Sequence, residues 1–107
     1  MNKPEEYCVV LTTCGDKQEA KNLACSLVES HLAACVQMTE VTSFYEWENK
    51  INKDDELLLL IKAKAERFEE IKTFIFENHS YEIPEIIELP IRGGLENYFK
   101  WIDEVSR

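Results

Sequence analysis

Residues able to do chemistry gather in the segment 79–86, which reads His-Ser-Tyr-Glu-Ile-Pro-Glu-Ile. This segment holds an imidazole, a phenol, two carboxylates and a rigid proline between a helical pattern and a strand pattern. Side chains at the ends of elements can converge on a site without being needed in the core. Imidazole and thiolate are ligands that suit copper, zinc or nickel. His79 is therefore a candidate metal ligand, although a histidine following a helix can equally serve as a partner of the helix dipole.

Four cysteines, at positions 8, 14, 25 and 35, could supply sulfur ligands. They form no CxxC pair, which excludes a structural zinc site of the usual spacing. Cys8 and Cys25 are predicted to lie in the core. Cys14 follows a strand pattern and is the cysteine that we expect beside His79. Cys35, taken alone, fits a small buried hydrophobic residue better than a ligand, and His31 fits a helix-dipole partner better than a ligand.

Composition narrows the possible partners. The chain has 107 residues, so residues 1–107 are expected to form a single domain. Its net charge of −9 argues against nucleic acid or an anionic membrane as a partner, because both require basic patches. Residues 1–6 do not resemble a signal peptide, and no apolar run approaches the roughly 20 residues of a membrane span. We expect a cytoplasmic protein whose cysteines are free thiols.

The pattern of apolar residues predicts an α+β fold. The order β-α-β-β-α-β-α is that of a ferredoxin-like βαββαβ sandwich with an added C-terminal helix. Right-handed crossovers place the first and third strands at the centre of the sheet. Asp16 and Glu19 form a possible capping box at the first helix. The expected strands are 7–13, 34–48, 56–63 and 85–91, the expected helices are 17–31, 68–78 and 98–105, and the chain reverses over 49–55.

The second strand is too long for one helix pair to cover. At about 3.3 Å per residue its fifteen residues span nearly 50 Å, so part of the hairpin should project from the core. The projecting part carries Phe44, Tyr45 and Trp47, which are costly to leave in water. Association of subunits through the hairpins, as a trimer, is the simplest solution. A bend that folds the hairpin back on itself is the alternative.

Strand direction suggests where the candidate ligands meet. We expect the first and third strands to be parallel, with the second and fourth running against them. The end of the first strand and the starts of the second and fourth then share one rim of the sheet. Cys35 would still be roughly 10–15 Å from the His79 segment, so it could join a site there only from a neighbouring subunit. This rim holds Cys14, Asp16, Cys35, His79, Tyr81, Glu82 and Glu85.

Three segments together resemble the CutA family of divalent-cation tolerance proteins. They are Leu-Ala-Ala-Cys at 32–35, Tyr-Glu-Trp-Glu-Asn-Lys at 45–50 and the segment 79–86, and the resemblance runs from about Val9 to Trp101. It implies a trimer with β-hairpins at the subunit contacts, and binding of divalent ions, copper before zinc or others. His79 and Cys35 match the family's proposed histidine and cysteine ligands, so the expected metal set is His79, Cys14 and Cys35.

The sequence favours a binding protein over an enzyme. It has no Ser/His/Asp order, nucleophile elbow or phosphate-binding glycine loop, and a Cys14–His79 pair would lack an obvious oxyanion donor. The alternative to metal binding is a signalling or ligand-binding module similar to trimeric PII proteins, although the chain lacks their long basic, glycine-rich loop. In that case an intersubunit cleft would bind a small molecule, and its lining residues would be Trp47, Lys62, Tyr81, Glu82 and Glu85.

Overall fold

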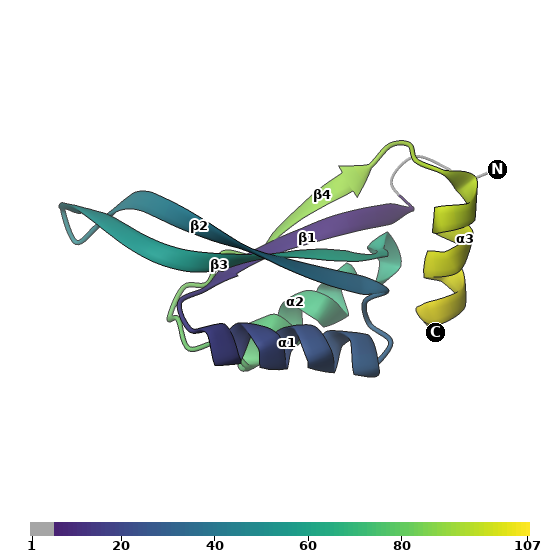
Figure 1. Cartoon of the computed structure of the whole chain (residues 1–107), viewed down its shortest axis with the longest axis horizontal. Helices are drawn as coiled ribbons and strands as arrows, with labels where there is room; N and C mark the ends of the chain where they lie inside the picture. The colour runs from purple at the N-terminus through teal and green to yellow at the C-terminus, as the bar shows by residue number, and fades with distance from the viewer. Residues whose placement is uncertain (1–5) are drawn as a thin grey trace.

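Four strands in the order β2-β3-β1-β4 form one antiparallel sheet that frames the molecule (Figure 1). The computed structural model describes residues 6–107. Residues 1–5, which make up most of the stretch compared above with a signal peptide, lie outside the described part. The element order and the central places of β1 and β3 confirm the predicted α+β fold. The elements are β1 (Tyr7–Cys14), α1 (Lys17–Glu29), β2 (Cys35–Trp47), β3 (Lys50–Lys64), a 3₁₀ turn (Ala65–Arg67), α2 (Phe68–Glu77), β4 (Ile87–Ile91) and α3 (Glu96–Val105).

The predicted directions of two strands, β2 and β3, are wrong relative to β1. β1 runs antiparallel to β3, with Cys14 opposite Leu57 and Tyr7 opposite Lys64. The physical reason is the connectivity: α1 returns the chain so that β2 runs parallel to β1, and the hairpin then turns β3 against both. The start of β2 therefore lies at the opposite end of the sheet from the end of β1. This reversal separates residues that the sequence had placed on one rim.

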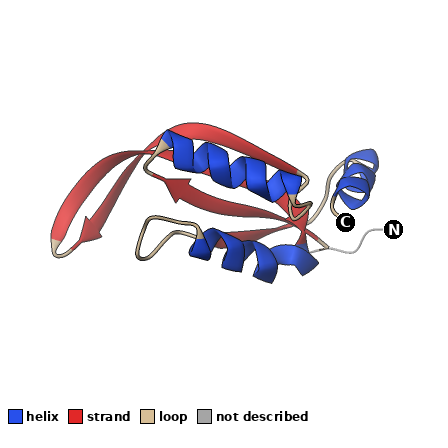
Figure 2. Cartoon of the chain, turned by 90° about the horizontal axis from the view of Figure 1, so that it is seen from below, coloured by secondary structure: helices blue, strands red, loops and turns tan. Residues whose placement is uncertain are grey.

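Helices α1 and α2 lie side by side on one face of the sheet (Figure 2). Leu27 of α1 and Ile71 and Ile75 of α2 are fully buried with Leu59 and Ile61 of β3 in one core cluster. Alternation along β3 explains this arrangement, because successive side chains point to opposite faces of a sheet. The helix pair fixes where the chain enters and leaves each helix, and so positions the loops at the end of β1.

The β2–β3 hairpin extends well past the helices (Figure 1), and the molecule measures 48 × 25 × 22 Å. Its reversal is tighter than predicted: Glu48 and Asn49 both have positive φ, of 52° and 64°, as in a type I′ turn. Residues 50–55, expected to be part of the turn, continue β3 instead. Phe44 and Trp47 on this arm are 68% and 46% exposed. The projection inferred from strand length is thus present in the single chain.

The last helix packs against the other end of the sheet. The rings of Tyr7 and Phe99 stack with centroids 4.4 Å apart, and the Tyr7 hydroxyl donates to the Asp103 carboxylate at 2.9–3.0 Å. His31 Nδ1 lies 3.2 Å from the Val105 carbonyl oxygen, so this histidine also contacts the end of α3. Pro90 lies within β4, opposite Cys8.

The Tyr7 contact predicts a loss of stability at alkaline pH. Burial, then the hydrogen bond to Asp103, raises the pKa of Tyr7 from 10 to about 12. The unfolded chain therefore loses this proton first, and the native state is destabilised between pH 10 and 12, by on the order of 2 kcal/mol. Tyr7→Phe should cost about 1 kcal/mol at neutral pH, and this deficit should disappear over that pH range. Urea unfolding of wild type and Tyr7→Phe at several pH values measures this stability difference. A difference that stays constant with pH would show that Tyr7 does not cause the alkaline loss of stability.

Candidate functional site

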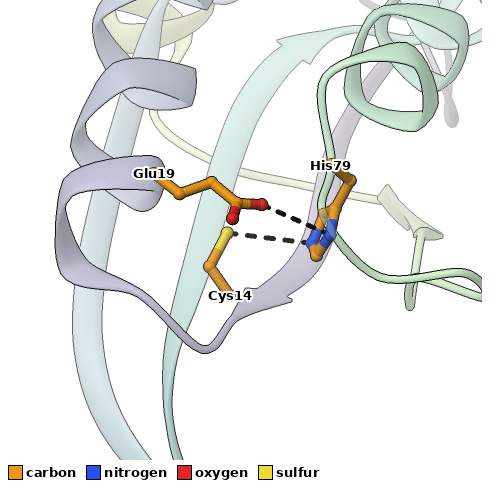
Figure 3. A group of neighbouring side chains, drawn as sticks. All are labelled: Cys14, Glu19 and His79. Carbon is orange, nitrogen blue, oxygen red and sulfur yellow. Dashed lines mark hydrogen bonds and ion pairs between the residues drawn. The ribbon is translucent and has the colours of Figure 1, made fainter.

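Three potential ligands meet where β1 ends (Figure 3). Cys14 is the last residue of β1, Glu19 lies in the first turn of α1 and His79 follows α2. Cys14 Sγ is 3.8 Å from His79 Nε2, and Glu19 Oε2 is 3.4 Å from His79 Nδ1. One ligand atom from each residue lies within 4.8 Å of the others. The expected proximity of Cys14 and His79 is therefore present, and Glu19 completes a group of sulfur, nitrogen and oxygen.

The hydrogen bonds of His79 indicate how its ring nitrogens are used. Nε2 lies 2.7 Å from the Thr13 carbonyl oxygen, which can only accept a hydrogen bond. Nδ1 accepts the Tyr81 backbone N–H at 3.1 Å. These partners favour the tautomer that carries a hydrogen on Nε2. The side chain is fully buried, and its contacts are not with the last carbonyl groups of α2, where Asn78 Nδ2 donates to the Phe74 carbonyl at 2.8 Å.

Glu19 links the start of α1 to the loop after α2. Its backbone N–H donates to Asp16 Oδ2 at 2.9 Å, which confirms Asp16 as the N-cap. Its carboxylate does not complete a capping box, because Oε2 instead accepts the Ser80 backbone N–H at 3.0 Å. The charge of Glu19 is thus placed beside both the imidazole and the Cys14 thiol.

Cys14 is fully buried. Burial first, and then the negative charges of Glu19, Glu56 and Asp16 in that order, together raise the pKa of its thiol from 9.0 to about 11. The thiol is therefore protonated at neutral pH, and an ion bound there must displace its proton. The 3.8 Å between Cys14 Sγ and His79 Nε2 is close to the spacing in a metal site, because tetrahedral bonds of about 2.3 Å to sulfur and about 2.05 Å to nitrogen place these atoms about 3.5 Å apart. Glu19 lies beside the other ring nitrogen, Nδ1.

A second site lies on the other side of the 79–86 segment, against the hairpin arm. A cavity of about 570 Å³ there is bounded by Trp47 of β2 and by Tyr81, Glu82 and Glu85. Four of the five residues predicted to line an intersubunit cleft thus meet within one chain. Lys62, the fifth, lies elsewhere on β3, opposite Cys35 in the strand register, and its amine donates to the Gln37 side chain.

The cavity floor depends on Tyr81. Its hydroxyl donates to Glu56 Oε2 at 2.7 Å, and burial, followed by this hydrogen bond, raises the pKa of the phenol. A Cβ added at Gly15 would lie 2.7 Å from the Tyr81 hydroxyl, so only glycine leaves room for this ring. No sequence pattern points to Glu56, whereas the capping pattern at the first helix points to Glu19.

Two cysteines lie away from their expected positions. Cys35 starts β2 opposite Lys62 of β3. Leu57 of β3 lies opposite Cys14 on one side and opposite Glu40 on the other. Cys35 is therefore about 16 Å further along the sheet than Cys14. It therefore does not share the rim with Cys14, because β1 and β3 are antiparallel. Burial, followed by the neighbouring Cys35 thiol, raises the pKa of the Tyr98 phenol of α3. Cys25, expected in the core, is exposed on α1, and its thiol donates to Glu29 Oε1 at 3.4 Å.

Comparison with known proteins identifies the family. Residues 8–105 match the family described as CutA1 divalent ion tolerance protein. The chain belongs to the CutA family. A CutA relative from Thermus thermophilus, a divalent-cation tolerance protein, is 40% identical over 97 residues, which cover 90% of this chain and 94% of the relative. The periplasmic divalent cation tolerance protein CutA from Archaeoglobus fulgidus superposes with a TM-score of 0.92 at 35% identity, covering 94% of this chain and 99% of that one.

CutA relatives differ in length and compartment. The chloroplastic CutA of Arabidopsis thaliana is 40% identical over 100 residues, which span 92% of this chain but 55% of that protein. The chain thus spans little more than half the length of this relative. Its name and that of the Archaeoglobus protein refer to two different compartments. Within residues 6–107, none of the helices has the length and hydropathy needed to cross a bilayer.

The contact between Gly15 and Tyr81 predicts non-additive mutations. Gly15→Ala should push the ring away and break the Tyr81–Glu56 hydrogen bond, for a loss of about 1 kcal/mol of stability. Tyr81→Phe should lose about the same amount by removing the hydroxyl. Because both act on one bond, the double variant should lose less than the sum of the two, as measured by urea denaturation. Strict additivity would show that the substitutions act independently.

Proposed function

We propose that the chain binds divalent transition-metal ions, copper in preference to zinc, at Cys14, Glu19 and His79, and that it contributes to divalent-cation tolerance. The observation that carries this proposal is the convergence of three potential ligand atoms within 4.8 Å. Thiolate and imidazole favour copper and zinc over harder ions, and copper binds most tightly along the first-row series. Membership of the CutA family supports a role in the handling of divalent ions.

The residues around the ion would set the conditions for binding. Cys14 must give up a thiol proton whose pKa is raised to about 11, and the imidazole must release one of its two backbone hydrogen bonds. Both requirements lower the affinity compared with a preformed site. Binding should therefore release protons and weaken as the pH falls. A site of this kind suits reversible buffering better than permanent retention of an ion.

Cys35 takes part in the proposal only through a neighbouring copy. It lies at the other end of the sheet from Cys14 in one chain, so it could reach a metal bound by His79 only across a subunit contact. Cys35→Ala tests that contribution directly. No disulfide is formed among the four cysteines, all of which are free, and free thiols suit the reducing cytoplasm in which we propose that the protein acts.

A competitive titration of reduced protein with copper and zinc tests the metal site. His79→Ala and Cys14→Ala should each weaken binding at least tenfold, because each removes a ligand contact worth more than about 1.4 kcal/mol. Cys25→Ala is the matched control, since its thiol is exposed on α1 and lies outside the cluster. Thermal unfolding of each variant establishes that it is folded before the titration.

Two results would count against this site. Weak binding that neither His79→Ala nor Cys14→Ala changes would mean that the acidic surface is the only metal sink. An equal loss in Cys25→Ala would mean that thiols bind without regard to position. A loss in Cys35→Ala comparable with that in His79→Ala would instead assign a ligand to the neighbouring copy.

We also propose that the protein is a homotrimer that associates through its hairpin arms. Support comes from the projecting β2–β3 arm and from the exposure of Phe44, Trp47 and Ile51, which is 77% exposed. Apolar side chains grouped on an arm that leaves the core are typical of an interaction surface.

Native mass spectrometry should return three times the 12.5 kDa chain mass. The substitution Phe44→Asp on the arm should shift the distribution towards smaller species, because it places a charge in the buried contact. Phe76→Asp is the control, since Phe76 is 61% exposed on α2, away from the arm. A stable wild-type monomer would refute the proposed assembly.

A second candidate function rests on a separate observation, the cavity beside Trp47 and Tyr81. Its volume of about 570 Å³ is within the range of small-molecule sites. In this view the protein is a small-molecule-binding module, with the cavity in the region of the expected intersubunit cleft. Extraction of purified protein followed by mass spectrometry tests whether an organic molecule is retained.

A further inference from the structure

Aromatic rings form one side of the cavity between the hairpin arm and the 81–85 segment. Tyr45 and Trp47, two residues apart on one face of β2, reach it from the arm, and Tyr81 reaches it from the facing segment. The two rings of the arm are exposed by 41% and 46%. The Tyr81 ring packs on His79, with centroids 4.8 Å apart, whereas the aromatic pairs found within residues 6–107 include neither ring of the arm. The rings of Tyr45 and Trp47 can therefore contact a molecule that enters the cavity.

Three carboxylates lie in the polar part of the lining, together with Thr13 and Ser43. Glu56 lies at the base, where it accepts the hydrogen bond of Tyr81, and Glu82 and Glu85 lie on the opposite segment. Within the described residues, Glu82 and Glu85 have no hydrogen bond or ion pair. Among the described residues, the lining includes no lysine, arginine or histidine. The negative charge of the cavity is therefore not balanced by a cation from the described part of the lining.

The combination selects one class of ligand. Negative charge favours a cation, and the faces of aromatic rings attract organic cations through their quadrupoles. A metal ion would gain nothing from these rings, since it prefers oxygen, nitrogen or sulfur ligands. A volume of about 570 Å³ also exceeds what a single ion needs. An alkylammonium group satisfies both features, because its apolar substituents contact the rings while its charge faces the carboxylates.

We propose that this cavity binds an organic ammonium ion, with the positive nitrogen between the aromatic rings of the arm and the carboxylates of Glu82 and Glu85. The inference specifies the ligand class of the second candidate function and rests on it. The lining of the cavity includes none of the side chains of the Cys14–Glu19–His79 cluster, although the Tyr81 backbone N–H donates to His79 Nδ1.

A fluorescence titration tests the proposal. The chain has two tryptophans, so Trp101→Phe leaves Trp47 as the only tryptophan and a reporter inside the cavity. Choline is added to this protein in the presence of a metal chelator, and its uncharged isostere 3,3-dimethylbutan-1-ol is added in parallel. We expect a saturable change with choline, an affinity at least tenfold weaker for the alcohol, and weaker choline binding at higher salt because the cavity is partly exposed.

Paired variants separate the carboxylates from general surface charge. Glu82→Gln combined with Glu85→Gln should weaken choline binding at least tenfold while keeping the shape of the cavity. Glu104→Gln is the matched control, because this exposed carboxylate lies on α3 at the other end of the molecule (Figure 1). The control should bind choline as the parent does. Far-ultraviolet circular dichroism checks that each variant is folded.

Each other outcome has a definite meaning. Equal affinity for choline and the alcohol would overturn the inference but keep a small-molecule cavity, so the second candidate function would stand. Absence of any saturable response, including the case in which a neighbouring subunit fills the cavity, would overturn the inference; the extraction experiment would then decide separately whether another molecule binds. Choline binding unchanged in the Glu82/Glu85 double variant would remove the role assigned to the carboxylates.

Discussion

The hydrogen bond between His79 Nε2 and the Thr13 carbonyl, 2.7 Å long, holds the segment after α2 against the end of β1. On one side of this bond lie Cys14 and Glu19, and on the other lies Tyr81 with its bond to Glu56. The two candidate sites therefore share a single anchor, although they use different side chains. A buried imidazole makes an effective anchor because it can bond at both nitrogens, and here its second nitrogen orders the Tyr81 backbone.

That anchoring role limits the chemistry available to the cluster. The same hydrogen bonds that fix the ring also occupy both of its nitrogens, and the burial that excludes water from Cys14 also keeps its thiol protonated. The side chains of the cluster therefore have hydrogen-bond partners, and a protonated thiol, that stabilise their arrangement without an ion. Metal binding has to compete with local structure, which distinguishes this cluster from a rigid zinc site whose ligands are held ready.

The periodicity of apolar residues was enough to predict the element order, the central strands and the projecting arm, because burial on one face dictates these features. Cys14 beside His79 also followed from topology. The errors arose where tertiary connections decide the outcome. The direction of β2 depends on how α1 returns the chain, and mistaking it placed Cys35 at the wrong end of the sheet. The turn at Glu48 was missed because a glutamate at positive φ has no local signature. Cys25 follows an apolar pattern but lies on the exposed side of α1, and Glu56 gains its role only through Tyr81.

The two edges of the sheet are unequal. β4, at one edge, is five residues long and contains Pro90, which has no N–H to offer an approaching strand. β2, at the other edge, runs for thirteen residues without a proline. Continuous growth of a sheet through many chains requires that both edges accept a partner, whereas short and proline-bearing edges resist such pairing. The asymmetry directs strand pairing towards β2 and opposes open-ended polymerisation, which protects a chain whose long arm would otherwise be an aggregation hazard.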